Sequence, residues 1–179
     1  VDYRMAPDFP YPAALDDAYS AYQYLLAQGY SPEHIAIAGE SAGGGLSLAL
    51  ALRLRDEGLP MPGCIAAISP WADLTLSGAS YRNNVLRDPS LIREALAYYA
   101  IAYAAGHEYE PYVSPVFGDY SNFPPCLLFA GGDEILLSDA KTVYQHLLRA
   151  GTRSELIVER GMWHVYPLYG TPEGKIALE

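Results

Sequence analysis

The stretch that decides the fold of this chain is Ile35-Ala36-Ile37-Ala38-Gly39-Glu40-Ser41-Ala42-Gly43-Gly44-Gly45-Leu46. Its apolar first half is typical of a buried strand, and the run from residue 46 to residue 55 is typical of a helix. The stretch therefore predicts a strand, a sharp turn and a helix, with Ser41 at the apex of the turn. Such a turn strains the backbone of the serine, and we expect side chains at Gly39 and Gly43 to clash there.

A serine in this position is a candidate nucleophile. The turn exposes its hydroxyl, the helix N-terminus points at it, and the amide of Ala42 is free to stabilise an oxyanion. A glycine-rich turn can instead bind nothing, or hold a phosphate. The phosphate alternative is the weaker one, because the glycines fit neither G-x-x-x-x-G-K-[ST] nor G-x-G-x-x-G and no lysine follows them.

The composition is that of one domain with an acidic surface. Hydrophobic residues make up 51% of the 179 residues and charged residues 18%, so the chain can bury a substantial core. Lys and Arg number 11 against 21 Asp and Glu, a net charge of −10. This balance argues against nucleic acid or an anionic membrane surface as a partner. No run of about 18 apolar residues occurs, so we expect no membrane span.

Two cysteines, Cys64 and Cys126, each open an apolar run that we interpret as a buried strand. Thiols on different strands are more often reduced core residues than a disulfide, and we expect both to be free. No cluster of cysteine and histidine has the spacing of a zinc site, so no metal is predicted. We expect the protein to be cytoplasmic.

Strands and helices alternate along the chain, which predicts an α/β domain over residues 1–179 with a mostly parallel sheet. Helices are expected at residues 13–29, 46–58, 90–105 and 136–150, and strands at 34–38, 64–69, 126–130 and 154–159, with residues 1–4 as the tail of an earlier strand. The strand at 64–69 is apolar throughout, as in strands buried on both faces. Residues 70–125 are expected to be an inserted region of loops and one helix, which either lines a pocket or packs over the sheet.

Three successive strand ends carry Ser41, the pair Asp133 and Glu134, and His164. Functional groups of open parallel sheets collect at the carboxyl ends of strands, and serine, acid, histidine is the order used by α/β-hydrolases. In that chemistry the imidazole removes the serine proton and returns it to the leaving group, while the carboxylate orients the imidazole. The sequence therefore predicts a catalytic triad.

The chain resembles, along essentially its whole length, the hormone-sensitive-lipase-like branch (bacterial family IV) of the α/β-hydrolases. The matching segments are Asp2-Tyr3-Arg4-Met5-Ala6-Pro7, Pro10-x-Pro12-Ala13, Gly39-Glu40-Ser41-Ala42-Gly43-Gly44, Ser69-Pro70-Trp71-x-Asp73-Leu74-Thr75, Val113-Ser114-Pro115 and Gly161-Met162-x-His164. The resemblance implies a carboxylesterase that hydrolyses short to medium acyl esters, with a small-molecule substrate and no cofactor.

The segment that carries the predicted triad acid departs from the family pattern. After the strand at 126–130, the family usually has Asp-Pro-Leu-x-Asp. Aligning the strands without a gap places Glu134-Ile135-Leu136-Leu137-Ser138 on that motif. The register favours Glu134 as the triad acid, with Asp133 as the alternative, and a glutamate is chemically adequate.

The family's other oxyanion donors come from a His-Gly-Gly-Gly loop that the chain does not contain. The family's strand order also places the last strand of that region between the strand at 1–4 and the strand at 34–38. A closing C-terminal helix would normally run where the chain ends, at residues 177–179. We therefore expect a fragment that is inactive or poorly folded alone, from a parent protein that is an esterase. A homodimer of the full-length protein is one option for its oligomeric state.

Two other functions stay open. The resemblance extends to the plant gibberellin receptors, which keep the fold but have lost the catalytic histidine, and the presence of His164 favours an enzyme. An amidase or deacetylase on the same triad is a closer alternative.

Overall fold

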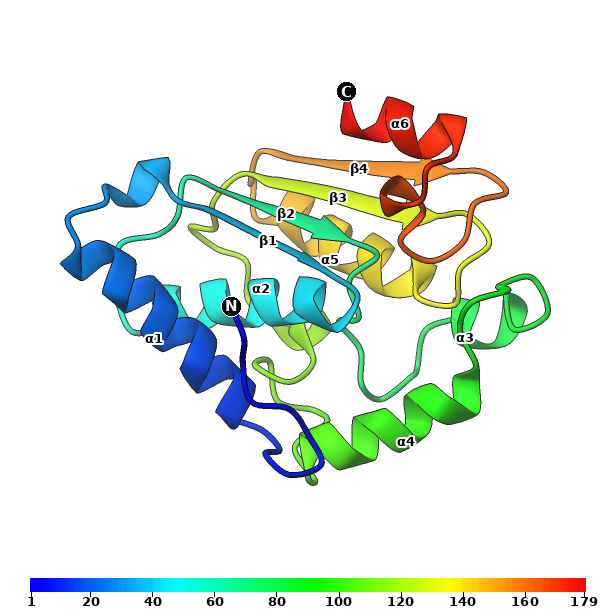
Figure 1. The fold of residues 1–179 in the computed structure, drawn as a ribbon, viewed down its shortest axis with the longest axis horizontal. Helices are drawn as coiled ribbons and strands as arrows, with labels where there is room; N and C mark the ends of the chain where they lie inside the picture. Colours follow the sequence, from blue (N-terminus) through cyan, green and yellow to red (C-terminus); the bar gives the residue numbers. More distant parts are fainter.

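The computed structural model describes residues 1–179 and contains one four-stranded sheet (Figure 1). All neighbouring strands are parallel and follow the order of the sequence: β1 (Ala36–Glu40), β2 (Cys64–Ile68), β3 (Cys126–Gly131) and β4 (Ser154–Glu159). The carboxyl ends of the strands therefore lie along one edge of the sheet, as the alternating pattern predicts.

Helices connect the strands as expected, with ends that differ by a few residues from the predicted ones. The longer ones are α1 (Ala13–Ala27), α2 (Ala42–Asp56), α4 (Arg93–Ala104) and α5 (Leu137–Arg149). Shorter elements are α3 (Ser80–Asn83), α6 (Pro172–Leu178) and the 3₁₀ turns Pro32–His34, Pro115–Phe117 and Tyr166–Leu168. None of the helices combines the length and the apolar character needed to cross a lipid bilayer.

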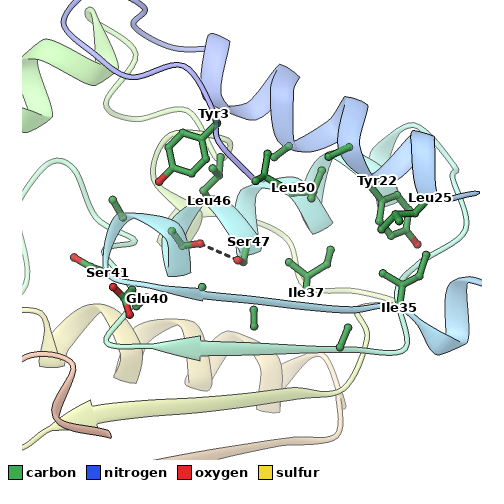
Figure 2. A pocket seen from close by; sticks show the side chains of 18 residues that line it. Tyr3, Tyr22, Leu25, Ile35, Ile37, Glu40, Ser41, Leu46, Ser47 and Leu50 are labelled. Carbon is green, nitrogen blue, oxygen red and sulfur yellow. Dashed lines mark hydrogen bonds between the residues drawn. The ribbon is translucent and has the colours of Figure 1, made fainter. Parts of the chain in front are cut away.

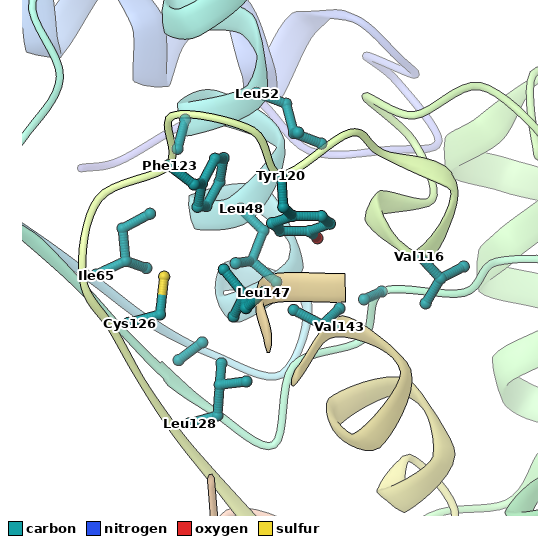
Figure 3. Close-up of a cluster of buried hydrophobic side chains, with 13 residues drawn as sticks. Leu48, Leu52, Ile65, Val116, Tyr120, Phe123, Cys126, Leu128, Val143 and Leu147 are labelled. Carbon is teal, nitrogen blue, oxygen red and sulfur yellow. The ribbon is translucent and has the colours of Figure 1, made fainter. Parts of the chain in front are cut away.

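The main core lies between one face of the sheet and helices α2 and α5 (Figure 3). Strand residues Ile65 and Leu128 meet Leu48 and Leu52 of α2 and Leu147 of α5 there, all with at most 1% of their surface exposed. On α5 the buried residues recur every three or four positions, which places them on one side of the helix. Helix α2 is instead buried almost all round, because α1 covers the side that the sheet does not.

The expectation that β2 is buried on both faces is wrong. Ile65 and Ala67 are buried against the helices, whereas Ala66 and Ile68 are half-buried and Cys64 is exposed. Successive side chains of a strand point to opposite faces, and no helix covers the second face at this position. Both cysteines are free, but only Cys126 is a core residue.

The start of the chain also differs from the sequence-based expectation. Residues 1–4 form no strand, because no neighbouring strand lies beside them to complete a ladder, and Arg4 instead bonds to Asp17 of α1 at 2.7 Å. At the other end, residues 172–178 form the short helix α6, which packs against the 3₁₀ turn Tyr166–Leu168 (Figure 1).

In the region between β2 and β3, helices α3 and α4 lie beyond α2 and α5 (Figure 1), whereas Val116, Tyr120 and Phe123 join the main core. Trp71, Tyr81 and Leu96 of this region form a separate buried cluster together with Ile135 and Leu136, which follow β3. The inserted region is therefore joined through its core to the loop that carries the predicted acid.

Candidate active site

The turn between β1 and α2 holds Ser41 in a strained conformation, with φ 52° and ψ −121°, which confirms the expected strain. Two hydrogen bonds to the end of β2 fix its backbone: Ser41 N donates to Ile68 O at 2.9 Å, and Trp71 N donates to Ser41 O at 2.9 Å. The serine hydroxyl is therefore held at the carboxyl edge of the sheet by the neighbouring strand.

The structure requires a glycine at only one of the two positions, Gly39 and Gly43, where the sequence predicts a clash. A Cβ on Gly39 would overlap with the carbonyl of Gly43, as expected, but a Cβ on Gly43 would meet nothing within 4 Å. The expected clash at Gly43 is wrong, because that position faces open space. The requirement falls instead on Gly45, whose Cβ would overlap with the carbonyl oxygen of Trp71. The run of three glycines was the available signal for this close approach.

His164 lies next to the serine. Its Nε2 is 2.9 Å from Ser41 Oγ, and its side chain is nearly buried, with 9% of its surface exposed. The backbone just after it has a positive φ of 52° at Val165, whose N–H donates to Ser69 Oγ at 3.0 Å. Ser69, at the end of β2, is a site residue that residue-by-residue reasoning missed, although it lies in the Ser-Pro-Trp segment.

Glu134 lies on the other side of the imidazole. Its Oε2 is 3.4 Å from His164 Nδ1, and the residue has no exposed surface. Asp133, the alternative acid, pairs instead with Arg87 at the surface, and its N–H donates to Met162 O at 2.9 Å. The structure thus brings Ser41, His164 and Glu134 together and directs Asp133 elsewhere.

Ala42 is the first residue of α2, so its amide has no acceptor within the helix and lies next to the serine. A groove of about 500 Å³ extends from Ser41 along β1, between that strand, α1, α2 and Tyr3 (Figure 2). Most of its lining is hydrophobic, with Leu46 and Leu50 of α2 on one wall. No group of three or more His, Cys, Asp or Glu side chains is placed to hold a metal ion.

Chemically, this arrangement can deliver a serine oxygen to a carbonyl carbon. The imidazole is within hydrogen-bond reach of the hydroxyl, which is the geometry that a general base needs. The buried carboxyl group of Glu134 faces the other ring nitrogen, at 3.4 Å, where it can orient the ring. The free N–H groups at the start of α2 favour negative charge nearby.

A family model described as the alpha/beta hydrolase fold matches residues 1–168. The chain is 41% identical over 180 residues to an acetyl-hydrolase of Streptomyces hygroscopicus, covering 99% of this chain and 60% of the relative. It is 39% identical over 182 residues to an esterase of Acinetobacter venetianus, again covering 99% of this chain and 60% of the relative.

Among solved structures, an esterase from the bacterial hormone-sensitive lipase (HSL) family superposes with a TM-score of 0.96 at 40% identity. The match covers 99% of this chain and 61% of that esterase. The chain therefore spans about 60% of the length of the relatives that it matches. From its residues, its parallel sheet and these matches together, the chain belongs to the α/β-hydrolase family.

Proposed function

We propose that this chain carries the nucleophile, base and acid of a serine carboxylesterase that hydrolyses short to medium acyl esters. The observation that carries the proposal is the contact between His164 Nε2 and Ser41 Oγ at 2.9 Å, with the buried Glu134 carboxylate behind the ring. The names of the relatives, an esterase and an acetyl-hydrolase, support the ester class and the small acyl group.

In the proposed first half-reaction, Ser41 Oγ attacks the acyl carbon while its proton passes to His164 Nε2. The carbonyl oxygen becomes an oxyanion that accepts a hydrogen bond from Ala42 N–H. Glu134 stabilises the imidazolium that forms. The intermediate then collapses, and His164 gives its proton to the departing alcohol oxygen, which leaves an acyl-serine.

In the second half-reaction, water attacks the acyl-serine. His164 takes a proton from the water, and the new carbon–oxygen bond forms a second tetrahedral oxyanion at the same amide. Collapse breaks the bond to Ser41 Oγ, which recovers its proton from the imidazolium. The carboxylic acid leaves, and the three side chains return to their starting state.

The test uses the full-length gene product that contains residues 1–179, assayed with p-nitrophenyl acetate and p-nitrophenyl butyrate. Ser41→Ala is expected to lower kcat by about 10⁴-fold or more, because the covalent path is lost. A fluorophosphonate probe should label the wild type and not this variant. Ester hydrolysis that survives Ser41→Ala would refute the proposal, and a folded wild type that neither turns over nor is labelled would favour a binding protein.

The acid is tested by a matched pair of neighbouring variants in the same assay. Glu134→Gln is expected to lower kcat by about 10²–10⁴-fold, because the amide cannot stabilise the imidazolium. Asp133→Asn is expected to change kcat by less than about threefold, because its carboxylate faces Arg87 at the surface. The reverse result would make Asp133 the acid.

A further inference from the structure

We propose that Asn84 and Asp88, in the segment after α3, are positioning residues that hold Glu134 beside His164. This inference rests on the proposed function. It assigns a role in catalysis to the inserted region, which contributes no group that touches the reacting atoms.

The carboxylate of Glu134 has unusually little to hold it in place. It is fully buried, and neither oxygen has a hydrogen-bond partner. Buried carboxylates normally accept several hydrogen bonds, which fix their orientation as well as offset the loss of water. With none here, the position of this side chain depends on the backbone that carries it and on the His164 ring, 3.4 Å away.

That backbone is held by side chains from the inserted region. Asn84 Nδ2 donates to the carbonyl oxygen of Glu134 at 2.8 Å, and to that of Gly132 at 3.4 Å. Ile135 N–H donates to Asp88 Oδ2 at 2.8 Å, and Ile135 O accepts from Ser80 Oγ at 2.5 Å. Side chains of residues 80–88 therefore form hydrogen bonds with the carbonyl of Glu134 and with both the N–H and the carbonyl of Ile135.

The two proposed positioning residues are themselves well fixed. Asn84 is 5% exposed and Asp88 is 7% exposed. The second oxygen of Asp88 accepts from Ser90 N at 2.9 Å and from Ser90 Oγ at 2.6 Å, so the carboxylate has little freedom to turn. Packing of Tyr81 in the same buried cluster as Ile135 adds a large apolar contact between the two segments.

Arg87 adds a weaker contact to the same arrangement. It pairs with Asp133, but its side chain is 57% exposed, so water and salt screen the pair. The buried amide and carboxylate therefore carry most of the positioning. Displacing a catalytic group by about 1 Å can cost about 100-fold in rate, which makes this arrangement measurable in kcat.

The experiment compares Asn84→Leu with Tyr81→Phe in the full-length gene product. Leucine has nearly the shape of asparagine but cannot donate to Glu134 O. The control removes the buried hydrogen bonds of Tyr81, on the adjacent helix α3, which run to Asp73 O and to Asp139, but none that reaches residues 132–135. Circular dichroism and thermal unfolding of each variant establish that it is folded at the assay temperature.

Asn84→Leu is expected to lower kcat by about 10- to 100-fold and to leave KM within about twofold of the wild type. Tyr81→Phe is expected to leave kcat within about threefold of the wild type, although its Tm falls by about as much as that of Asn84→Leu. The downfield ¹H resonance of the imidazole Nδ1–H that faces Glu134 should weaken or shift in Asn84→Leu and stay unchanged in the control. Asp88→Asn, which keeps an acceptor for Ile135 N–H, should retain more activity than Asp88→Ala.

Equal kcat and an unchanged resonance in Asn84→Leu and the wild type would overturn the inference. So would an equal loss in the control, since that would indicate general loosening of the fold. The proposed function fails separately, through activity that survives Ser41→Ala. If Ser41→Ala abolishes turnover while Asn84→Leu does not lower it, only the positioning role is refuted.

Discussion

The two sides of the candidate site are supported very differently. On the side of Glu134 and His164, strands β3 and β4 pair along their full length, and side chains from the inserted region hold the acid loop. On the side of Ser41, β1 has a hydrogen-bonded neighbour on one side only, and the groove lies along the other (Figure 2). The serine is therefore held mainly from β2, through Ile68 and Trp71.

This difference shows that a strand end is positioned by what lies beside it as much as by its own sequence. An edge strand leaves a row of backbone N–H and C=O groups without partners, and it can pair with another strand. Strand β4 is the other edge strand of the sheet, so the two sides of the site differ in the side chains that hold the acid loop and not in the number of free edges. Substitutions at covered positions should therefore be costly, and matched substitutions at neighbouring open positions should be mild.

The largest effect is expected from two adjacent leucines of β3. Leu128→Ala, in the covered core, should lower the free energy of unfolding by about 2–5 kcal/mol, because the fully buried side chain leaves a cavity. Leu127→Ala, on the other face, should cost about 1 kcal/mol, since that side chain is only half-buried. Urea unfolding of the full-length gene product measures both values. Equal losses would mean that both faces are covered in solution.

A second pair compares glycines at the start of α2. Gly45→Ala should cost about 3 kcal/mol, because its Cβ would overlap with the backbone of Trp71, which cannot move without disturbing Ser41. Gly43→Ala, which points to open space, should be neutral or stabilising by up to about 1 kcal/mol through helix propensity. Thermal unfolding checks the stability of both variants. A Gly43→Ala variant as unstable as Gly45→Ala would show that the open side is filled.

The smallest effect, and one that depends on pH, is expected at Asp139 on α5. Its Oδ2 accepts from Ala72 N–H and Asp73 N–H at 2.9 Å each, while Oδ1 is buried without a partner. Desolvation by burial raises the pKa of this carboxyl well above 3.8 despite those bonds. The folded chain therefore binds this proton more tightly than the unfolded chain. The resulting stability is present below pH 3.8 and is lost as the pH rises through the native pKa.

Asp139→Asn keeps an acceptor for the two amides and removes the charge. The variant should therefore gain stability relative to the wild type as the pH is raised from about 4 to about 8, measured by urea unfolding across that range. Asp139→Ala, which leaves the amides unpaired, should be less stable than the wild type at all these pH values. A constant difference between Asp139→Asn and the wild type across the range would contradict the raised pKa.

Much of the fold can be predicted because it depends on patterns within short segments. Alternation of apolar runs with helical periodicity locates β1 to β4 and the helices between them to within a few residues. The strained turn at Ser41 follows from glycines within four positions of it. The predictions that are wrong concern features that depend on residues distant in the sequence. They are the burial of Cys64, the strand at residues 1–4 and the clash at Gly43.

The sequence by itself determined the order of elements and the three strand ends at which Ser41, an acid and His164 stand, because periodicity and strand direction are local properties. Only the tertiary structure decided that Glu134 and not Asp133 faces the imidazole, and that Asn84 and Asp88 hold its backbone. The physical reason is that adjacent residues in a turn point in different directions. Which direction meets His164 depends on contacts with side chains about 50 positions away, which come together only when the chain folds.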